Sequence, residues 1–255
     1  MLKHYLSYYL VVVATLLLFS NIALAQSVVH TESSDLSRKS DGFTGKLNLN
    51  LNFVQNINDV LQSNGNAQMQ YRIKKHSFIS LSALNLTVLN GNRILNDGLQ
   101  HLRYGYDLTN RVTMEAFSQA QYNEIIKIQG RYLNGAGPRF SIFSSDSINL
   151  LFGTLYMYEH ENETTGITNT HHRLSAYLSS GWQATDAINL DFIIYFQPDL
   201  MRPKDYRVST EFTMETTITK RLSYRLALAW FYDAFPPDGI RNVFYNIRNG
   251  LSFSF

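Results

Sequence analysis

Histidines and carboxylates gather in one polar stretch of the chain, between residues 159 and 172. The stretch holds Glu159, His160, Glu161, Glu163, His171 and His172. If two strands form a hairpin here, its ends meet, and imidazole and carboxylate groups form a ligand set that zinc accepts. His160 and His171 are the metal candidates, and they are weak ones. His172 cannot join His171 as a ligand, because neighbouring residues of a strand point to opposite faces. We expect a solvated loop, with no metal and no other cofactor.

Nucleophilic and acid–base chemistry has less support. The chain contains no cysteine, which excludes disulfide bonds, thiolate metal sites and a cysteine nucleophile. A membrane phospholipase would need Ser, His and an orienting Asn or carboxylate at one rim, and no Asp-Ser-Asn-Gly pattern places such groups together. His101 and Glu115 lie on neighbouring predicted strands as a conceivable acid–base pair, but an internal salt link fits them better. We therefore expect a protein without enzymatic activity.

Composition and charge limit the remaining classes. The 255 residues include 22 basic and 20 acidic side chains, with a net charge of +2. This balance excludes a nucleic-acid partner bound through bulk positive charge. Tyrosine and phenylalanine number 16 each, and aromatic residues favour strands.

The first 25 residues have the pattern of a cleaved secretory signal peptide. Lys3 gives a basic start, residues 10–19 form a short apolar run, and Ala23-Leu24-Ala25 is a small-x-small exit. The apolar run is short for a membrane helix, which needs about 20 residues, although an uncleaved anchor is the alternative. Residues 26–41 are polar and aperiodic, which predicts a flexible N-terminal segment.

From residue 42 to residue 255, apolar and polar residues alternate with a period of two. Residues 43–53 are an example: Phe43, Leu47, Leu49 and Leu51 alternate with polar residues, which is typical of a strand with one apolar face. Eleven further segments repeat the pattern, so we predict twelve strands. One of them changes phase, and we expect a β-bulge near residues 83–84 to restore it.

The predicted connections alternate in length, and this alternation favours a barrel. The short ones are 74–77, 107–110, 144–147, 183–186 and 219–221; the long ones are 56–64, 90–97, 123–129, 160–170, 198–205 and 234–241. Transmembrane barrels combine short periplasmic turns with longer outer loops. A secreted β-sandwich is the alternative, but many predicted strands exceed the roughly five or six residues usual in soluble sheets. We predict an all-β fold, a transmembrane antiparallel β-barrel of about twelve strands.

The C-terminal residues resemble the signal read by the outer-membrane assembly machinery. Gly250 precedes Phe253 and Phe255, two aromatic residues at alternate positions with the last one terminal. Such an apolar final strand would pair with the first strand and close the barrel, leaving no open edge. We thus expect export to the outer membrane of a Gram-negative cell, with lipid, lipopolysaccharide and the assembly machinery as partners.

One segment carries a family resemblance. Arg131, the Gly135-Ala136-Gly137-Pro138-Arg139 run, Gly153, Tyr156 and Glu159 make up this segment. Together with the C-terminal strand, they resemble the domain-of-unknown-function 481 family, described as salt-induced outer membrane proteins. The resemblance spans residues 42–255 and implies an outer-membrane barrel without a known activity. For the glycines and proline we expect a role in barrel curvature.

If the apolar rows face lipid, the opposite rows line a lumen. The predicted lumen-lining residues are Lys46, Arg72, Arg103, Glu115, Arg139, Arg173, Arg207, Glu211, Arg225 and Arg248. Twelve strands lie between filled barrels of eight and open porins of 16 to 18. Two functions follow: a narrow passive channel for small anionic or polar solutes, or a non-conducting structural or stress-response barrel with a charge-plugged lumen. The positive excess on the predicted inner face favours anions.

Overall fold

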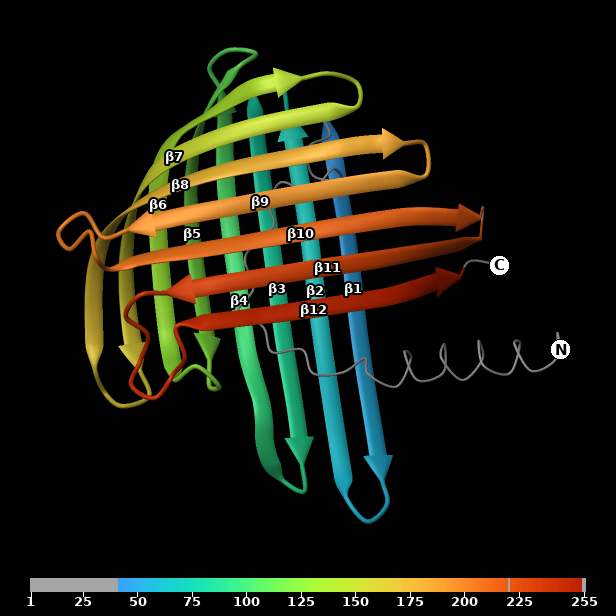
Figure 1. The fold of residues 1–255 in the computed structure, drawn as a ribbon, viewed down its shortest axis with the longest axis vertical. Helices are drawn as coiled ribbons and strands as arrows, with labels where there is room; N and C mark the ends of the chain where they lie inside the picture. The colour runs from blue at the N-terminus through green and yellow to red at the C-terminus, as the bar shows by residue number, and fades with distance from the viewer. Residues whose placement is uncertain (1–40, 220, 254–255) are drawn as a thin grey trace, which may run out of the picture.

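The computed structural model describes residues 41–219 and 221–253, and along them the chain folds into twelve β-strands (Figure 1). The predicted signal peptide, residues 26–40 and Phe255 lie outside the described residues. The strands are β1 (Gly42–Gln55), β2 (Asp59–Ile73), β3 (His76–Leu89), β4 (Asn92–Asp107), β5 (Val112–Asn123), β6 (Ile128–Ser144), β7 (Ile148–Glu163), β8 (Thr168–Thr185), β9 (Ile188–Pro198), β10 (Tyr206–Thr219), β11 (Leu222–Asp233) and β12 (Val243–Phe253). No helix in these two ranges is long and apolar enough to cross a membrane.

Every strand pairs antiparallel with the next one along the chain, in a single sheet ordered from β1 to β12. The predicted all-β fold of twelve antiparallel strands is confirmed. The sheet curves strongly, so that β9–β12 cross over β1–β4 in Figure 1 as two opposite walls. Within the described residues, the strand ladders leave β1 and β12 at the two edges. Closure between these two strands stays a prediction.

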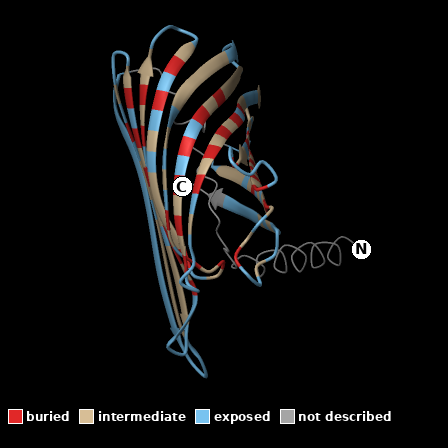
Figure 2. Ribbon diagram, turned by 90° about the vertical axis from the view of Figure 1, so that its left-hand side faces the viewer, coloured by how far each residue is buried: buried red, intermediate tan, exposed pale blue. Residues whose placement is uncertain are grey.

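The two faces of the sheet have opposite character. Along β8, Arg173, Ser175 and Ser179 are buried, whereas Leu178 on the other face is 39% exposed. Phe192 and Phe196 of β9 lie outward, and the Ile193 and Tyr195 side chains between them are buried. Figure 2 shows this alternation as red and paler bands along the central strands. The inner face combines buried polar and charged groups with an apolar cluster, whereas the outer face is apolar. An apolar outer face inverts the pattern of a soluble protein, as expected for a sheet that lipid surrounds.

Several predicted long connections are mostly strand. The segments 56–64, 90–97 and 160–170 shrink to turns of two to four residues, because β2, β4, β7 and β8 extend into them. The alternation of apolar and polar residues is weak in these segments, because strand ends that extend beyond the lipid do not need apolar side chains on their outer face. Asn90 and Gly91 both have positive φ, at 49° and 79°, which is the geometry of a tight hairpin turn. The connections before β10 and β12 remain long.

The bulge predicted near residues 83–84 is wrong. Strand β3 pairs with β2 without a register shift, and its irregularity against β4 lies between Thr87 and Val88. Ile79 and Leu81 therefore face inward and are buried against each other, whereas Phe78 and Leu84 face outward. The sequence pattern suggests a bulge because these two inward residues are apolar, as the outward residues after them are, so that the apolar row changes phase along the segment.

Two glycines allow strands β6, β7 and β8 to approach closely. A Cβ at Gly137 would overlap the carbonyl oxygen of Thr154 and lie 2.6 Å from the Cα of Leu155. A Cβ at Gly153 would overlap the ring of Tyr177, which occupies that space. A side chain at Gly137 would push against the backbone of β7, and one at Gly153 would displace the Tyr177 ring. A role of these glycines in barrel curvature stays a prediction.

Candidate functional site

The inner face carries a buried network of ion pairs centred on Glu159. This side chain is fully buried and contacts three guanidinium groups, from Arg131, Arg173 and Arg207. Its Oε2 accepts a hydrogen bond of 2.7 Å from Nε of Arg173, and its Oε1 lies 3.2 Å from Nε of Arg131. A buried carboxylate is tolerated only when such partners compensate its lost hydration.

Further carboxylates complete this network, which we call the Glu159 layer. Glu161 pairs with Arg131 and lies 3.3 Å from Arg207, and Asp233 accepts a hydrogen bond of 2.7 Å from Nε of Arg207. The layer consists of Arg131, Glu159, Glu161, Arg173, Arg207 and Asp233. It joins β6, β7, β8, β10 and β11, with each charged side chain on the inward phase of its strand.

A second group, the Glu115 layer, lies nearer the short-turn end. Glu115 contacts Arg139 at 3.0 Å and Arg103 at 3.6 Å. Its Oε2 also accepts a hydrogen bond of 2.8 Å from the hydroxyl of Tyr177, which reaches across the interior from β8 to β5. The layer thus consists of Arg103, Glu115, Arg139 and Tyr177. It ties β8 to β4, β5 and β6 across the interior.

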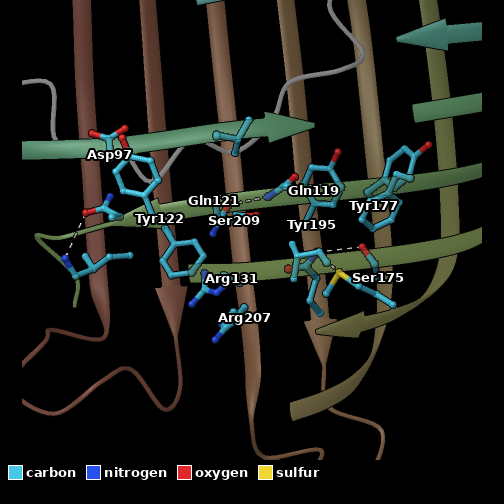
Figure 3. Close-up of a pocket in the computed structure, with 18 of the residues that line it drawn as sticks. Asp97, Gln119, Gln121, Tyr122, Arg131, Ser175, Tyr177, Tyr195, Arg207 and Ser209 are labelled. Atoms are coloured by element: carbon cyan, nitrogen blue, oxygen red, sulfur yellow. Dashed lines mark hydrogen bonds between the residues drawn. The ribbon is translucent and has the colours of Figure 1, made fainter. Parts of the chain in front are cut away.

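A cavity of about 110 Å³ lies between the two layers (Figure 3). Arg131 and Arg207 lie together at one side of it, and Tyr177 and Tyr195 lie at another. Amide groups from Gln119, Gln121 and Gln197 also line it, and the two β5 glutamines share a hydrogen bond of 2.7 Å. Apolar side chains such as Phe117 and Leu155 complete the lining. A space of this size with polar groups on its walls has room for a few water molecules.

The predicted lumen-lining residues fall into three groups. Arg103, Glu115, Arg173, Arg207 and Glu211 are buried in the interior. Arg72, paired with Asp107, and Arg139 are half-buried. Lys46, Arg225 and Arg248 are exposed near the open edges of the sheet, and Arg248 lies 3.7 Å from Glu211.

The sequence interpretation missed several buried carboxylates. They are Asp97, Glu161, Glu163, Asp199 and Asp205. With them, the buried charged side chains of the described residues are nine acids and four arginines, so the predicted positive excess is not found among buried groups. Glu159, Glu161 and Glu163 keep a spacing of two, and this continued phase was a sign that β7 extends through all three.

The hypothetical acid–base pair is held apart. His101 of β4 lies opposite Gln119, and its Nδ1 is 2.8 Å from the Oε1 of that residue. Glu115 lies opposite Gly105, four positions away along the ladder, within its own layer. The two side chains therefore serve separate polar contacts.

The two histidines proposed as metal candidates also have different surroundings. His160 is outward-facing, and its ring lies 3.4 Å from the hydroxyl of Thr170. His171 is buried on the inner face, and its Nδ1 lies 2.7 Å from Oδ2 of Asp199 and 3.7 Å from Oδ2 of Asp205. The neighbours of His171 are thus not His160 but two aspartates from the loop between β9 and β10.

Asp199 is held in its ionised form. Burial raises the pKa of this carboxyl, but hydrogen bonds from His171 and from the backbone N–H groups of Met201 and Arg202 outweigh it. The pKa of Asp199 is therefore below its usual value. A charged, oriented carboxylate is available beside His171.

The C-terminal strand holds two of the three predicted assembly residues. Gly250 lies opposite Arg225, and Phe253 lies opposite Leu222 at the end of the β11–β12 ladder. β12 has β11 on one side only, which leaves a free edge in the described part of the chain. Recognition of these residues by assembly machinery stays a prediction.

An antiparallel all-β sheet with an apolar outer face and a charged inner face defines a β-barrel protein of the outer-membrane type. The particular family follows from the sequence: the chain belongs to the family described as protein of unknown function, DUF481, whose model matches residues 58–255. The resemblance found in the sequence is confirmed. The search of curated proteins found no match.

The solved structures that resemble the chain include porins and a channel. A structure described as the NanC porin has 9% identity and a TM-score of 0.48, over 82% of this chain and all of the other. The KdgM porin has 9% identity and a TM-score of 0.44, over 80% and 98%. The CymD monoaromatic hydrocarbon channel has 7% identity and a TM-score of 0.43, over 86% and 81%. Likeness at this level does not by itself define a function.

Proposed function

We propose that the protein is an outer-membrane β-barrel that conducts small polar solutes through a passage narrowed by the Glu159 layer. The observation that carries the proposal is a cavity with charged, amide and hydroxyl groups among its lining, which lies between two layers of charged side chains, inside an apolar outer wall. A purely structural barrel has no need for buried charges, because apolar packing of the same volume is often equally stable. Export to the outer membrane and assembly there belong to the same proposal.

Of the two solute classes that the sequence left open, the buried residues favour uncharged polar solutes over anions. Nine buried carboxylates against four buried arginines give no net positive field along the interior. The arginines that line the cavity are also engaged with carboxylates, as Arg207 is with Glu159 and Asp233. Amide and hydroxyl groups remain to exchange hydrogen bonds with a passing solute.

Single-channel recording in planar lipid bilayers tests the proposal. We expect small discrete steps from the wild-type protein, with no preference for anions in a salt gradient. Glu159→Gln removes the shared anion of three arginines, which should disorder the Glu159 layer and raise the conductance. Asp233→Asn, which removes one ion-pair partner of Arg207, should raise it less and serves if the first variant does not fold.

The matched control is Glu124→Gln, because Glu124 pairs with Arg93 at 3.1 Å in an exposed position outside the interior. It should leave the conductance unchanged. If wild type, Glu159→Gln and Asp233→Asn all fold, shown by a heat-dependent shift in electrophoretic mobility, and all remain silent, the proposal is overturned. That result would support the alternative of a non-conducting structural barrel.

A further inference from the structure

Three potential metal ligands converge at the end of the barrel where the long loops lie. One donor atom each from His171, Asp199 and Asp205 lies within 4.8 Å of the other two. Nδ1 of His171 is 2.7 Å from Oδ2 of Asp199 and 3.7 Å from Oδ2 of Asp205. The three side chains are between 3% and 7% exposed. One nitrogen and two carboxylate oxygens from buried residues form a donor set suited to a divalent transition metal.

The Oδ1 atom of each aspartate accepts hydrogen bonds from other groups, and these bonds orient the Oδ2 atom toward His171. Oδ1 of Asp199 accepts hydrogen bonds from the backbone N–H groups of Met201 and Arg202, at 2.7 and 3.1 Å. Oδ1 of Asp205 accepts a hydrogen bond of 2.8 Å from Arg173. Such outer contacts fix the geometry of metal-binding carboxylates in proteins.

The loop that supplies both aspartates is itself held in place. The backbone N–H of Asp199 donates to the carbonyl of Asp205 at 2.8 Å, which closes the loop on itself. Asp199 also forms a β-bridge with Arg173, next to His171 on β8. The three donors therefore belong to one ordered unit.

A positive group already occupies the position where a cation would bind. Nη2 of Arg202 lies 3.0 Å from Nδ1 of His171, 3.7 Å from Asp199 and 3.5 Å from Asp205. The Arg202 side chain is 63% exposed, so it can leave for solvent without breaking buried packing. The buried donors would stay behind as a vacant, negatively charged pocket.

The hydrogen bonding at Nδ1 of His171 is inconsistent with a neutral ring that satisfies both neighbours. A neutral imidazole nitrogen either donates a proton, here to Asp199 at 2.7 Å, or accepts one, here from Arg202 at 3.0 Å. It cannot do both. With a proton on Nδ1, the N–H of Arg202 faces another donor; without it, the carboxylate of Asp199 faces another acceptor. A metal ion resolves this conflict, because it accepts lone pairs from Nδ1 of His171 and from one carboxylate oxygen of each aspartate at the same time.

We propose that His171, Asp199 and Asp205 form an exchangeable binding site for a divalent transition-metal ion such as zinc, with Arg202 as the group that the ion displaces. Calcium fits less well, since it takes six to eight oxygen ligands. The site has three protein ligands and leaves one tetrahedral position for water. It requires no conduction by the barrel, so its test is independent of the proposed function.

Calorimetric titration with zinc chloride, on the whole protein refolded in detergent, tests the site. We expect one ion per chain in the wild type. His171→Gln and Asp199→Asn should each weaken zinc binding by at least about tenfold, as expected for loss of a ligand. Arg202→Gln should instead strengthen it, by about tenfold, because the competing cation is gone. A merely structural arginine would not give this gain.

His160→Gln is the matched control, because it removes a histidine at the same end of the barrel but on the outward face. It should bind zinc as the wild type does. Absence of binding in both the wild type and Arg202→Gln overturns the proposal, as does equal affinity in folded His171→Gln. The fold of each variant is checked by its heat-dependent mobility shift, so that loss of binding is not confused with loss of structure.

Discussion

Strands β6–β10 and the edge strands β1 and β12 follow the same sequence pattern but have different interiors. On β7 and β8 the inward side chains Glu159 and Arg173 are completely buried and paired. On β1 every residue is exposed, including the inward-phase Lys46. The difference shows that a polar inner row becomes a stabilising network only where the curvature of the sheet brings opposing side chains into contact.

The largest effect should come from the centre of the Glu159 layer. Glu159→Ala leaves three arginines without their shared carboxylate, and breaking a buried pair costs about 3–5 kcal/mol. Lys46→Ala, on the same face of β1, should change stability by no more than about 0.5 kcal/mol. Urea unfolding followed by tryptophan fluorescence measures both. Equal losses would contradict the distinction between the two regions.

A charge on the outer face is the next test. Leu226→Arg places a cation toward lipid on β11, at a cost of about 2–4 kcal/mol near the bilayer midplane. The neighbouring Arg225→Ala alters an exposed inward residue and should leave assembly unaffected. The fraction of heat-modifiable protein after refolding into lipid vesicles measures this. Similar yields for both variants would show that the two faces are assigned wrongly.

Glycine substitutions sharpen the comparison in the backbone. Gly137→Ala forces a Cβ against the backbone of β7, and overpacking of this kind costs about 1–3 kcal/mol. Gly65→Ala on β2 meets only the flexible end of Leu49, at 3.2 Å, and should cost less. Unfolding midpoints give the order. If Gly65→Ala were the more harmful, close approach of the β7 backbone at Gly137 would not explain the order of stability.

The smallest effect should be a pH dependence at Asp199. The pKa of its carboxyl is lowered in the folded protein, so its contribution to stability is present at neutral pH. That contribution is lost as the pH falls through the folded pKa, which lies below the usual value of 3.8. The stability gap between wild type and Asp199→Asn, measured in EDTA, should therefore narrow on acidification below about pH 4. A gap that grows would contradict this sign.

The period of two was sufficient to predict the strands and, on most of them, the inward face. It places Arg207 and Glu159 inside, but it does not show that they meet, since 48 residues separate them and the contact depends on the curvature and register of the whole sheet. The period is also absent from loops, so nothing in the sequence indicated that Asp199 and Asp205 turn inward beside His171. On β3, the inward Ile79 and Leu81 broke the rule that apolar residues face lipid.

In the part of the chain that the structure describes, β1 and β12 stand at the two ends of the strand order, and this has a consequence for the order of folding. Each described ladder joins strands that are consecutive in the chain, so a hairpin can form with little loss of chain entropy and add to the one before it. Joining β1 to β12 would instead connect segments roughly 200 residues apart, a much longer loop closure than any of the described ladders requires. We therefore expect the pairing of β1 with β12, which closes the barrel, to be the slow step of folding. An assembly factor would have its largest influence on the folding rate at this step.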